Sequence, residues 1–145
     1  NATILGGVYS INPVETEKQS IEPLENKIHA LEDETVTLSC NYESTATSNY
    51  LQWYRQYPGS RPEYLLMIFP TTKAVSHATP PFPHLNVTEQ ANIVNLTISS
   101  AAISDSALYY CALQPTVTEN PATLKILLFK VTLYINNVYF RKRNH

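Results

Sequence analysis

Glycine is scarce in this chain, with three residues in 145, and none of them forms a glycine-rich phosphate loop or a nucleophile elbow. Histidine is nearly as rare, and the spacing of the four residues is not that of metal ligands: His29, His77, His84 and His145. These absences predict a chain that is not an enzyme, with no catalytic residue, no bound metal and no cofactor.

An excess of charge of one sign is also missing, because 10 Lys and Arg residues face 12 Asp and Glu residues, for a formal net charge of -2. No strong electrostatic field would attract nucleic acid or anionic lipid. We therefore expect a protein partner and no nucleic acid. Ten tyrosines favour this expectation, since a tyrosine ring offers broad contact area at low entropic cost.

Only two cysteines occur, Cys40 and Cys111, too few for a zinc site without histidine ligands. A disulfide is the simpler interpretation. Sequons begin at Asn1, Asn86 and Asn95, and in a secreted chain Asn86 and Asn95 are candidate glycosylation sites. Together these features predict an extracellular setting, although the sequence starts without Met or an apolar leader, so a signal peptide is not part of it.

The length predicts one domain with a short extension at each end. Residues 1–19 show no sustained hydrophobic period, which predicts a loose leader or an added edge strand. From residue 20 to 113, short runs of period two recur between turn signals, as in an antiparallel sandwich, and long helices are absent. Residues 114–145 form a tail of different character.

The alternation assigns side chains to faces. Val36, Leu38 and Cys40 share an inward face. In the next strand Leu51, Trp53 and Arg55 lie on one face, and the other face holds Gln52, Tyr54 and Gln56. A turn at residues 57–60 leads into an apolar run at 64–69, which predicts a first hairpin. Pro80, Pro81 and Pro83 restrict the segment that follows to an edge strand or a loop. Residues 85–87 and 94–98 alternate around a polar turn, which predicts a second hairpin.

Both cysteines fall on inward faces of strands that are distant in sequence, so their bond would join two sheets. Closing a loop of about 70 residues stabilises a fold by roughly 4 kcal/mol in the loop-entropy description. Trp53 would pack its ring against this bond from the neighbouring strand. Tyr109 stands two residues before Cys111, where a tyrosine hydroxyl bonds back to the backbone at a sheet-to-sheet corner.

Three motifs carry a resemblance to the immunoglobulin variable-type fold: Leu38-Ser39-Cys40, Leu51 through Gln56, and Asp105 through Cys111. The resemblance implies an all-β, two-sheet antiparallel sandwich with one inter-sheet disulfide and a core around Trp53, Leu96 and Tyr109. The alternative is an unrelated all-β domain that holds a chance disulfide.

Within that family the chain is most similar to T-cell receptor alpha or delta variable segments, through the residues from Trp53 to Gln56, Leu96 to Ser99 and Tyr109 to Leu113. This similarity implies a beta-type partner chain, a peptide-presenting protein as ligand, and a place on the extracellular face of the plasma membrane. Signalling subunits would bind only through regions outside this sequence. An antibody light chain and an innate or adhesion receptor are the alternatives.

The resemblance places chain pairing on the outward face that holds Tyr54, Gln56 and Tyr110, with Gln56 at its centre; the alternative is a solvated polar face. Loops near residues 43–49 and 70–75, and the segment after Cys111, would form the antigen-binding end. Short polar side chains there suit adaptable hydrogen bonding. The candidate antigen-loop residues are Ser44, Thr45, Thr47, Ser48, Asn49, Thr71, Thr72, Leu113 and Gln114.

Two departures from the family pattern follow from the residues present. Asp105 commonly pairs in the family with an arginine near position 84, where this chain has His84, so we expect a weaker or protonation-dependent pair. The Phe-Gly-x-Gly motif of a joining segment is absent, and no glycine follows Gly59. The chain thus resembles a germline variable segment read past its end. For residues 124–140 the alternatives are a sheet-completing strand, a membrane span, and translated flanking sequence.

Overall fold

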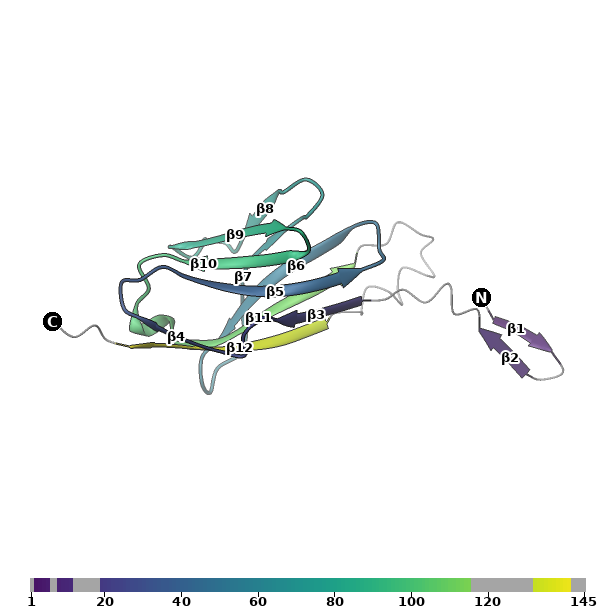
Figure 1. Cartoon of the computed structure of the whole chain (residues 1–145), viewed down its shortest axis with the longest axis horizontal. Coiled ribbons are helices and arrows are strands. Elements are labelled where there is room, and N and C mark those ends of the chain that lie inside the picture. The colour runs from purple at the N-terminus through teal and green to yellow at the C-terminus, as the bar shows by residue number, and fades with distance from the viewer. Residues whose placement is uncertain (1, 6–7, 12–18, 116–131, 142–145) are drawn as a thin grey trace.

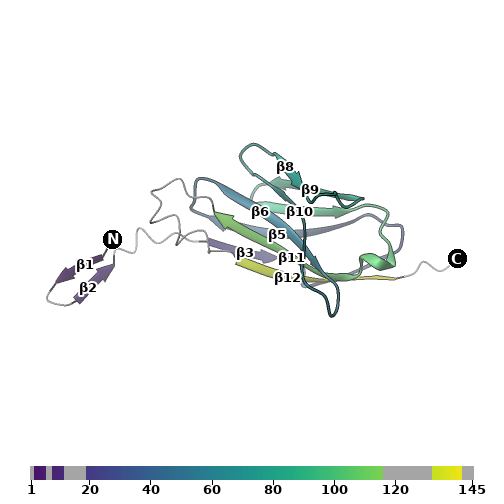
Figure 2. The ribbon, with the colours of Figure 1, turned by 180° about the vertical axis from the view of Figure 1, so that it is seen from behind.

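The computed structural model describes residues 2–5, 8–11, 19–115 and 132–141 of the chain. Apart from a two-stranded hairpin near the N-terminus, its strands form two sheets that pack face to face (Figures 1 and 2). The four-stranded sheet has the order β3 (Gln19–Pro23), β5 (Val36–Ser44), β10 (Ile93–Ile98) and β9 (Leu85–Gln90). The six-stranded sheet has the order β4 (Lys27–Leu31), β12 (Thr132–Arg141), β11 (Ala107–Pro115), β6 (Asn49–Gln56), β7 (Glu63–Ile68) and β8 (Val75–His77).

The core lies between the sheets and is built by the predicted alternation along each strand. Trp53 and Tyr109 are fully buried, and Leu96 reaches them from the opposite sheet. The Cys40–Cys111 disulfide joins β5 to β11, with its two Cα atoms 6.7 Å apart. Trp53 lies directly opposite Cys111 in the β6–β11 register. The all-β sandwich with one inter-sheet disulfide is therefore confirmed.

The hairpin between β9 and β10 turns through two residues, Ala91 and Asn92, which have positive φ values of 53° and 64°. Positive φ at both central positions is the geometry of a type I′ turn, whose twist matches that of the paired strands. Asn tolerates this region better than most residues, whereas Ala does not. The turn keeps β9 and β10 in continuous register from Leu85↔Ile98 to Gln90↔Ile93.

A short 3-10 helix, η2 (Ile103–Asp105), carries the chain from one sheet to the other before β11. The Tyr109 hydroxyl donates a hydrogen bond of 2.7 Å to the backbone carbonyl of Asp105. The Asp105 carboxylate accepts one of 2.8 Å from the Ala102 amide. Burial raises the pKa of Tyr109, so the phenol stays neutral as a donor. This is the tyrosine corner that the spacing before Cys111 predicted.

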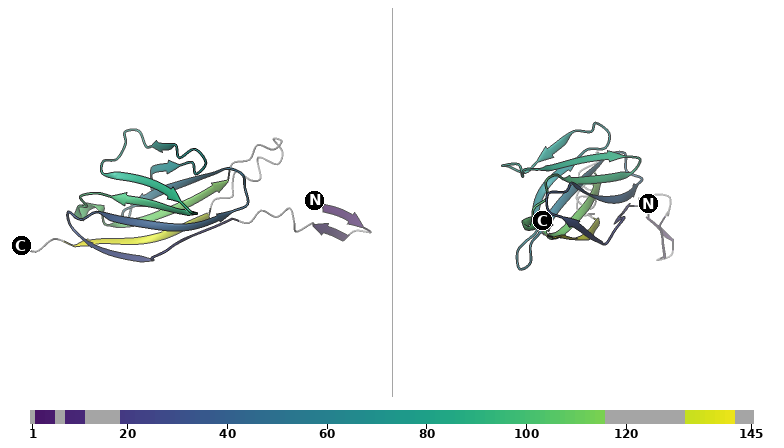
Figure 3. Two further views of the ribbon diagram at one scale, coloured as in Figure 1. Left: turned by 45° about the horizontal axis from the view of Figure 1, so that its top comes forward. Right: turned by 60° about the vertical axis from the view of Figure 1, so that its left-hand side comes forward.

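The two ends of the chain add strands. The segment expected to be a loose leader contains a hairpin of β1 (Ala2–Leu5) and β2 (Val8–Ile11), and β3 begins at Gln19 on the edge of the four-stranded sheet. At the other end, β12 pairs antiparallel with β11 and parallel with β4 (Figure 3). Part of the tail is thus a strand, while residues 116–131 lie outside the described residues. None of the described residues belongs to a helix long and apolar enough to span a membrane.

Candidate recognition surface

The outer face of the six-stranded sheet carries a set of tyrosine and glutamine side chains. In β6 the side chains of Leu51, Trp53 and Arg55 point into the core, so their neighbours in sequence point outward. Tyr110 lies directly opposite Tyr54 in the β6–β11 register. We call this surface the Tyr/Gln face; its members are Gln52, Tyr54, Gln56, Tyr64, Tyr110 and Gln114, all half-buried.

Hydrogen bonds hold these side chains in place. The Tyr110 hydroxyl donates to Gln56 Oε1, and Gln56 Nε2 donates to the Ser60 carbonyl at 2.9 Å. A second chain of bonds runs from the Tyr54 hydroxyl to Gln52 Oε1 at 2.7 Å. Gln52 Nε2 continues it to Gln114 Oε1 at 3.2 Å. The face is therefore ordered before any partner binds, which reduces the entropy lost on binding.

Tyr64 belongs to the same face, although the sequence pattern did not assign it there. Its ring meets that of Tyr54 edge-on, with centroids 5.7 Å apart, and its hydroxyl donates to the Ser76 carbonyl at 3.0 Å. Burial raises the pKa of both Tyr54 and Tyr64, so both phenols are neutral donors at physiological pH. The β6–β7 register shifts between Trp53 and Tyr54, and Leu65 and Leu66 are both buried there. Because of this irregularity, a strict alternation of period two does not identify Tyr64 as an outward residue.

Arg55 lies beneath the Tyr/Gln face as a buried cation. Its guanidinium carbon lies 4.9 Å from the ring centroids of both Tyr57 and Phe82. Nη2 donates to Glu63 at 3.0 Å, and Nη1 lies 3.8 Å from Asp105. Burial alone would lower the arginine pKa, but the Glu63 hydrogen bond and nearby charges raise it overall. The guanidinium thus connects β6 with β7 and with η2.

The expectation for Asp105 needs correction. Its cationic partner is Arg55, not His84. His84 has a φ of 65°, is exposed, and contributes its backbone carbonyl to a hydrogen bond from the Ser99 amide. Sequence reasoning missed this pair because Arg55, as an inward residue of β6, is brought to Asp105 only by the packing of β6 beside β11.

Two of the expected loops meet the end of β11 at one end of the sandwich. Pro115 lies opposite Asn49 in the β6–β11 register, and the rings of Tyr50 and Phe69 are 4.5 Å apart. Ser44 donates to the Asn49 side chain at 2.8 Å across the base of the β5–β6 loop. Among the candidate antigen-loop residues of these two loops, Thr45, Thr47, Thr71 and Thr72 are exposed, and Ser48 is half-buried.

Leu113 is the one buried residue among the candidate antigen-loop residues. It lies within β11, opposite Leu51, and its side chain is fully buried in the core. A ligand at the loop end does not reach a side chain in that position. Gln114, the next residue, points the other way and belongs to the Tyr/Gln face. The pairing of β11 with β6 extends to Pro115, which is why these residues are strand and not loop.

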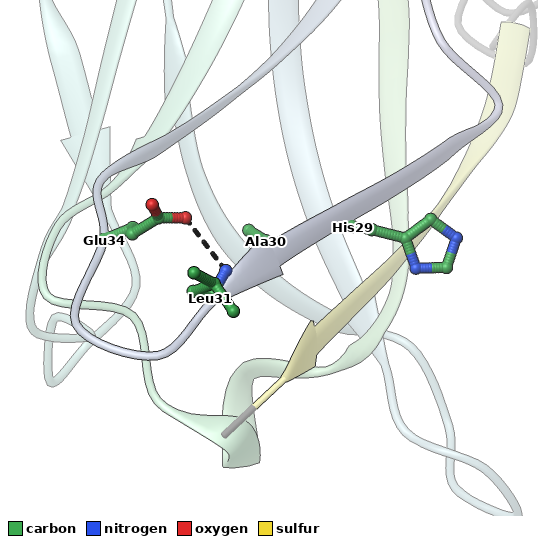
Figure 4. Close-up of a pocket in the computed structure, with 4 residues that line it drawn as sticks. All are labelled: His29, Ala30, Leu31 and Glu34. Atoms are coloured by element: carbon green, nitrogen blue, oxygen red, sulfur yellow. Dashed lines mark hydrogen bonds between the residues drawn. The ribbon is translucent and has the colours of Figure 1, made fainter. Parts of the chain in front are cut away.

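A surface depression of about 300 Å³ lies at the end of β4, lined by His29, Ala30, Leu31 and Glu34 (Figure 4). The Glu34 carboxylate accepts a hydrogen bond of 2.9 Å from the Leu31 amide, while His29 points away from it (Figure 4). Within the described part of the chain, no three His, Cys, Asp or Glu side chains gather as a metal site. The depression therefore offers no candidate metal site among the described residues.

Comparison with known proteins identifies the class to which this sandwich and its ordered face belong. The sequence profile of the Immunoglobulin V-set domain matches residues 24–131, and the chain belongs to this family. Its relatives include T cell receptor alpha variable 38-1 of Homo sapiens, 34% identical over 65% of this chain and 79% of the relative. The T-cell receptor alpha chain V region RL-5 of Oryctolagus cuniculus is 33% identical over 68% of this chain and 71% of the relative.

A longer relative is the T cell receptor alpha chain MC.7.G5 of Homo sapiens, 33% identical over 68% of this chain. The match spans 35% of that receptor chain. The similarity to T-cell receptor alpha and delta variable segments that the motifs indicated is therefore confirmed.

Proposed function

We propose that this chain is the antigen-recognition variable domain of a T-cell receptor alpha-like chain. It pairs with a beta-type chain through the Tyr/Gln face and binds peptide on a presenting protein with its loop end, outside the cell at the plasma membrane. The observation that carries the proposal is the ordered Tyr/Gln face itself. It has the composition of a protein interface, rich in tyrosine and free of charged side chains among its six members.

Gln56 is the side chain best equipped to meet a partner. A glutamine amide has two N–H donors and two acceptor lone pairs on oxygen. Tyr110 uses one lone pair of Gln56, and the Ser60 carbonyl uses one N–H. One donor and one acceptor therefore remain for a facing amide of the partner. The intrachain bonds fix the orientation of this amide, so a partner side chain meets a defined target.

The loop end supports the second half of the proposal. The β5–β6 and β7–β8 loops meet the end of β11 through the Tyr50–Phe69 ring contact and the Pro115–Asn49 pairing. Thr45, Thr47, Thr71 and Thr72 are exposed there, and such short side chains adapt their hydrogen bonds to different peptides. Lys73 of the β7–β8 loop donates to the Glu89 carbonyl at 2.8 Å, which anchors that loop to β9.

Co-expression of the whole chain with a panel of beta-type variable domains tests the pairing. We expect a heterodimer on size-exclusion chromatography, and its loss in Gln56→Arg, since a buried unpaired charge in an interface costs about 2 kcal/mol or more. Thr37→Arg, on the exposed face of the other sheet, is the matched control and should pair normally. Equal loss in both variants, self-association without a beta-type chain, or no pairing with any of the panel would contradict the proposal.

Antigen binding needs a separate measurement on the assembled pair. The heterodimer should bind a presenting protein loaded with peptide, and Thr47→Arg in the exposed β5–β6 loop should change that binding while leaving the heterodimer intact. Binding of equal strength with every peptide, and with or without the Thr47→Arg substitution, would contradict peptide recognition. It would not contradict the proposed pairing with a beta-type chain.

A further inference from the structure

The two internal sequons, Asn86-Val87-Thr88 and Asn95-Leu96-Thr97, lie side by side on the outer face of the four-stranded sheet. The β9–β10 register places Asn86 opposite Thr97 and Asn95 opposite Thr88. Each acceptor asparagine therefore lies across from the hydroxyl residue of the other sequon. The middle residue of each sequon, Val87 or Leu96, is buried, so both asparagines point away from the core.

The two asparagines differ in their surroundings. Asn86 is exposed and lies on β9, the edge strand of the sheet, with a paired strand on one side only. Asn95 is half-buried on the central strand β10, between β5 and β9. Its Oδ1 accepts a hydrogen bond from the Ser39 hydroxyl, which ties β10 to β5. Space for a bulky substituent is thus present at Asn86 and restricted at Asn95.

Spacing limits this face to one large substituent. Asn86 and Asn95 are diagonal neighbours on adjacent antiparallel strands, and such positions lie about 7–8 Å apart. Two branched oligosaccharides starting at that separation would compete for the same volume above the sheet. Asn86 leaves the ribosome first, so its sequon is presented first for modification during synthesis.

We propose that Asn86 carries an N-linked glycan that covers the outer face of the four-stranded sheet, while Asn95 remains unmodified and holds Ser39. In the transfer, Asn86 Nδ2 bonds to the anomeric carbon of the first sugar of an oligosaccharide joined to a lipid pyrophosphate. The bond from that carbon to the pyrophosphate oxygen breaks, Nδ2 loses one proton, and the lipid pyrophosphate leaves. No electron transfer is involved, and the Asn86 carbonyl oxygen is unchanged.

The composition of this outer face fits a glycan-covered surface. The cross-strand neighbours of Asn86 and Asn95 include Thr37, Ser39, Thr88 and Thr97, which are short and uncharged. They offer hydroxyl groups for hydrogen bonds with sugar but no aromatic anchor for a protein partner. A glycan here directs protein contacts to the opposite sheet.

Site mapping on the full chain, expressed behind a cleavable leader in a eukaryotic secretory cell, tests the acceptor. Peptide N-glycosidase in heavy-oxygen water converts each glycosylated asparagine to labelled aspartate, which mass spectrometry locates in the total cell lysate and the medium. Of the two internal sequons, we expect the label at Asn86 alone. Thr88→Ala should abolish it, and Thr97→Ala, the matched control, should leave it unchanged. Label at Asn95, at both sites, or at neither overturns the proposal.

The accessibility of the outer face of the four-stranded sheet tests whether the glycan covers it. Thr37→Cys lies in the same cross-strand row as Thr97 and Asn86, whereas Ser76→Cys is exposed on β8 of the other sheet. A bulky polyethylene-glycol maleimide should label Thr37→Cys several-fold faster after glycan removal and label Ser76→Cys at an unchanged rate. Equal labelling of Thr37→Cys before and after glycan removal would show that the glycan does not cover the sheet. Because both readouts use the chain without a partner, failure here is distinct from failure of chain pairing.

Discussion

The outward faces of the two sheets differ in chemistry although the sheets share one core. The six-stranded sheet presents tyrosine and glutamine joined by hydrogen bonds between neighbouring strands, as in Tyr110–Gln56 and Gln52–Gln114. The four-stranded sheet presents serine, threonine and asparagine, such as Ser39 and Asn95. The inward residues of both sheets are mostly apolar, with the buried cation Arg55 as an exception in the six-stranded sheet. The inward half of each strand builds the shared core, whereas the outward half gives each sheet a surface of different chemistry.

The largest expected effect comes from removing a large side chain from the core that both sheets share. Trp53→Ala deletes a fully buried ring next to the disulfide and should lower the free energy of unfolding by about 3–5 kcal/mol. Chemical denaturation with tryptophan-independent detection, such as far-UV circular dichroism, measures it. Both faces should lose their order together. A loss below about 1 kcal/mol would mean that the core closes around the cavity at little cost.

The next effect concerns Arg55, whose ion pairs join β6 to β7 and to η2. Arg55→Leu keeps the apolar bulk but leaves Glu63 and Asp105 without their cation, and should cost about 3 kcal/mol in the free energy of unfolding. Arg61→Leu, at an exposed position of the β6–β7 turn, is the matched control and should change stability by less than about 0.5 kcal/mol. Similar effects in the two variants would contradict a specific role for the buried guanidinium.

A pH-dependent effect is expected where the β7–β8 loop of one sheet meets β9 of the other. Burial would raise the Glu89 pKa, but hydrogen bonds from Lys73 and Tyr42 lower it below its ordinary value of 4.5. A carboxylate with a lowered folded pKa stabilises the fold fully above pH 4.5, and this contribution is lost as pH falls through the folded pKa.

Glu89→Gln should therefore lower stability by about 1–2 kcal/mol at neutral pH, and the gap to wild type should narrow in acid. Thermal unfolding of Glu89→Gln and of the wild type across the acidic pH range measures how the stability of each protein changes with pH. Glu43→Gln, at an exposed position of β5, is the control and should follow the wild-type profile. A constant difference between Glu89→Gln and wild type at every pH would show that the carboxylate charge is not what matters.

The smallest effect tests the hydroxyl-rich face itself. Ser39→Ala removes the hydrogen bond to Asn95 and should cost about 0.5–1.5 kcal/mol, measured by denaturant titration. Thr37→Ala, in the next cross-strand row, should have less effect because its contact with the Thr97 hydroxyl is long, at 3.5 Å, and exposed. Reversal of this order would show that Asn95 is not held by Ser39.

Much of the fold was predictable because its signals are local. Alternation in period two placed Leu38, Cys40, Trp53 and Tyr109 inward, and all four are buried. Tyr64 was not predictable in the same way, because the shift in the β6–β7 register breaks the alternation. Leu113 was assigned to a loop because no local signal marks where β11 ends. The end of a strand depends on how far its neighbour offers a pairing partner. Here β6 provides partners for β11 as far as Asn49, which pairs with Pro115.

By itself, the sequence indicated the sandwich, the disulfide and the family, since the spacings of its cysteines, tryptophan and tyrosine match the hallmarks of this fold. Only the tertiary structure decided how distant polar side chains combine. Arg55 meets Asp105 and Gln56 meets Tyr110 because segments far apart in the chain pack side by side, and the register of the β9–β10 hairpin places each acceptor asparagine across from the hydroxyl residue of the other sequon. Such contacts depend on strand order and register, which alternation along a single strand does not encode.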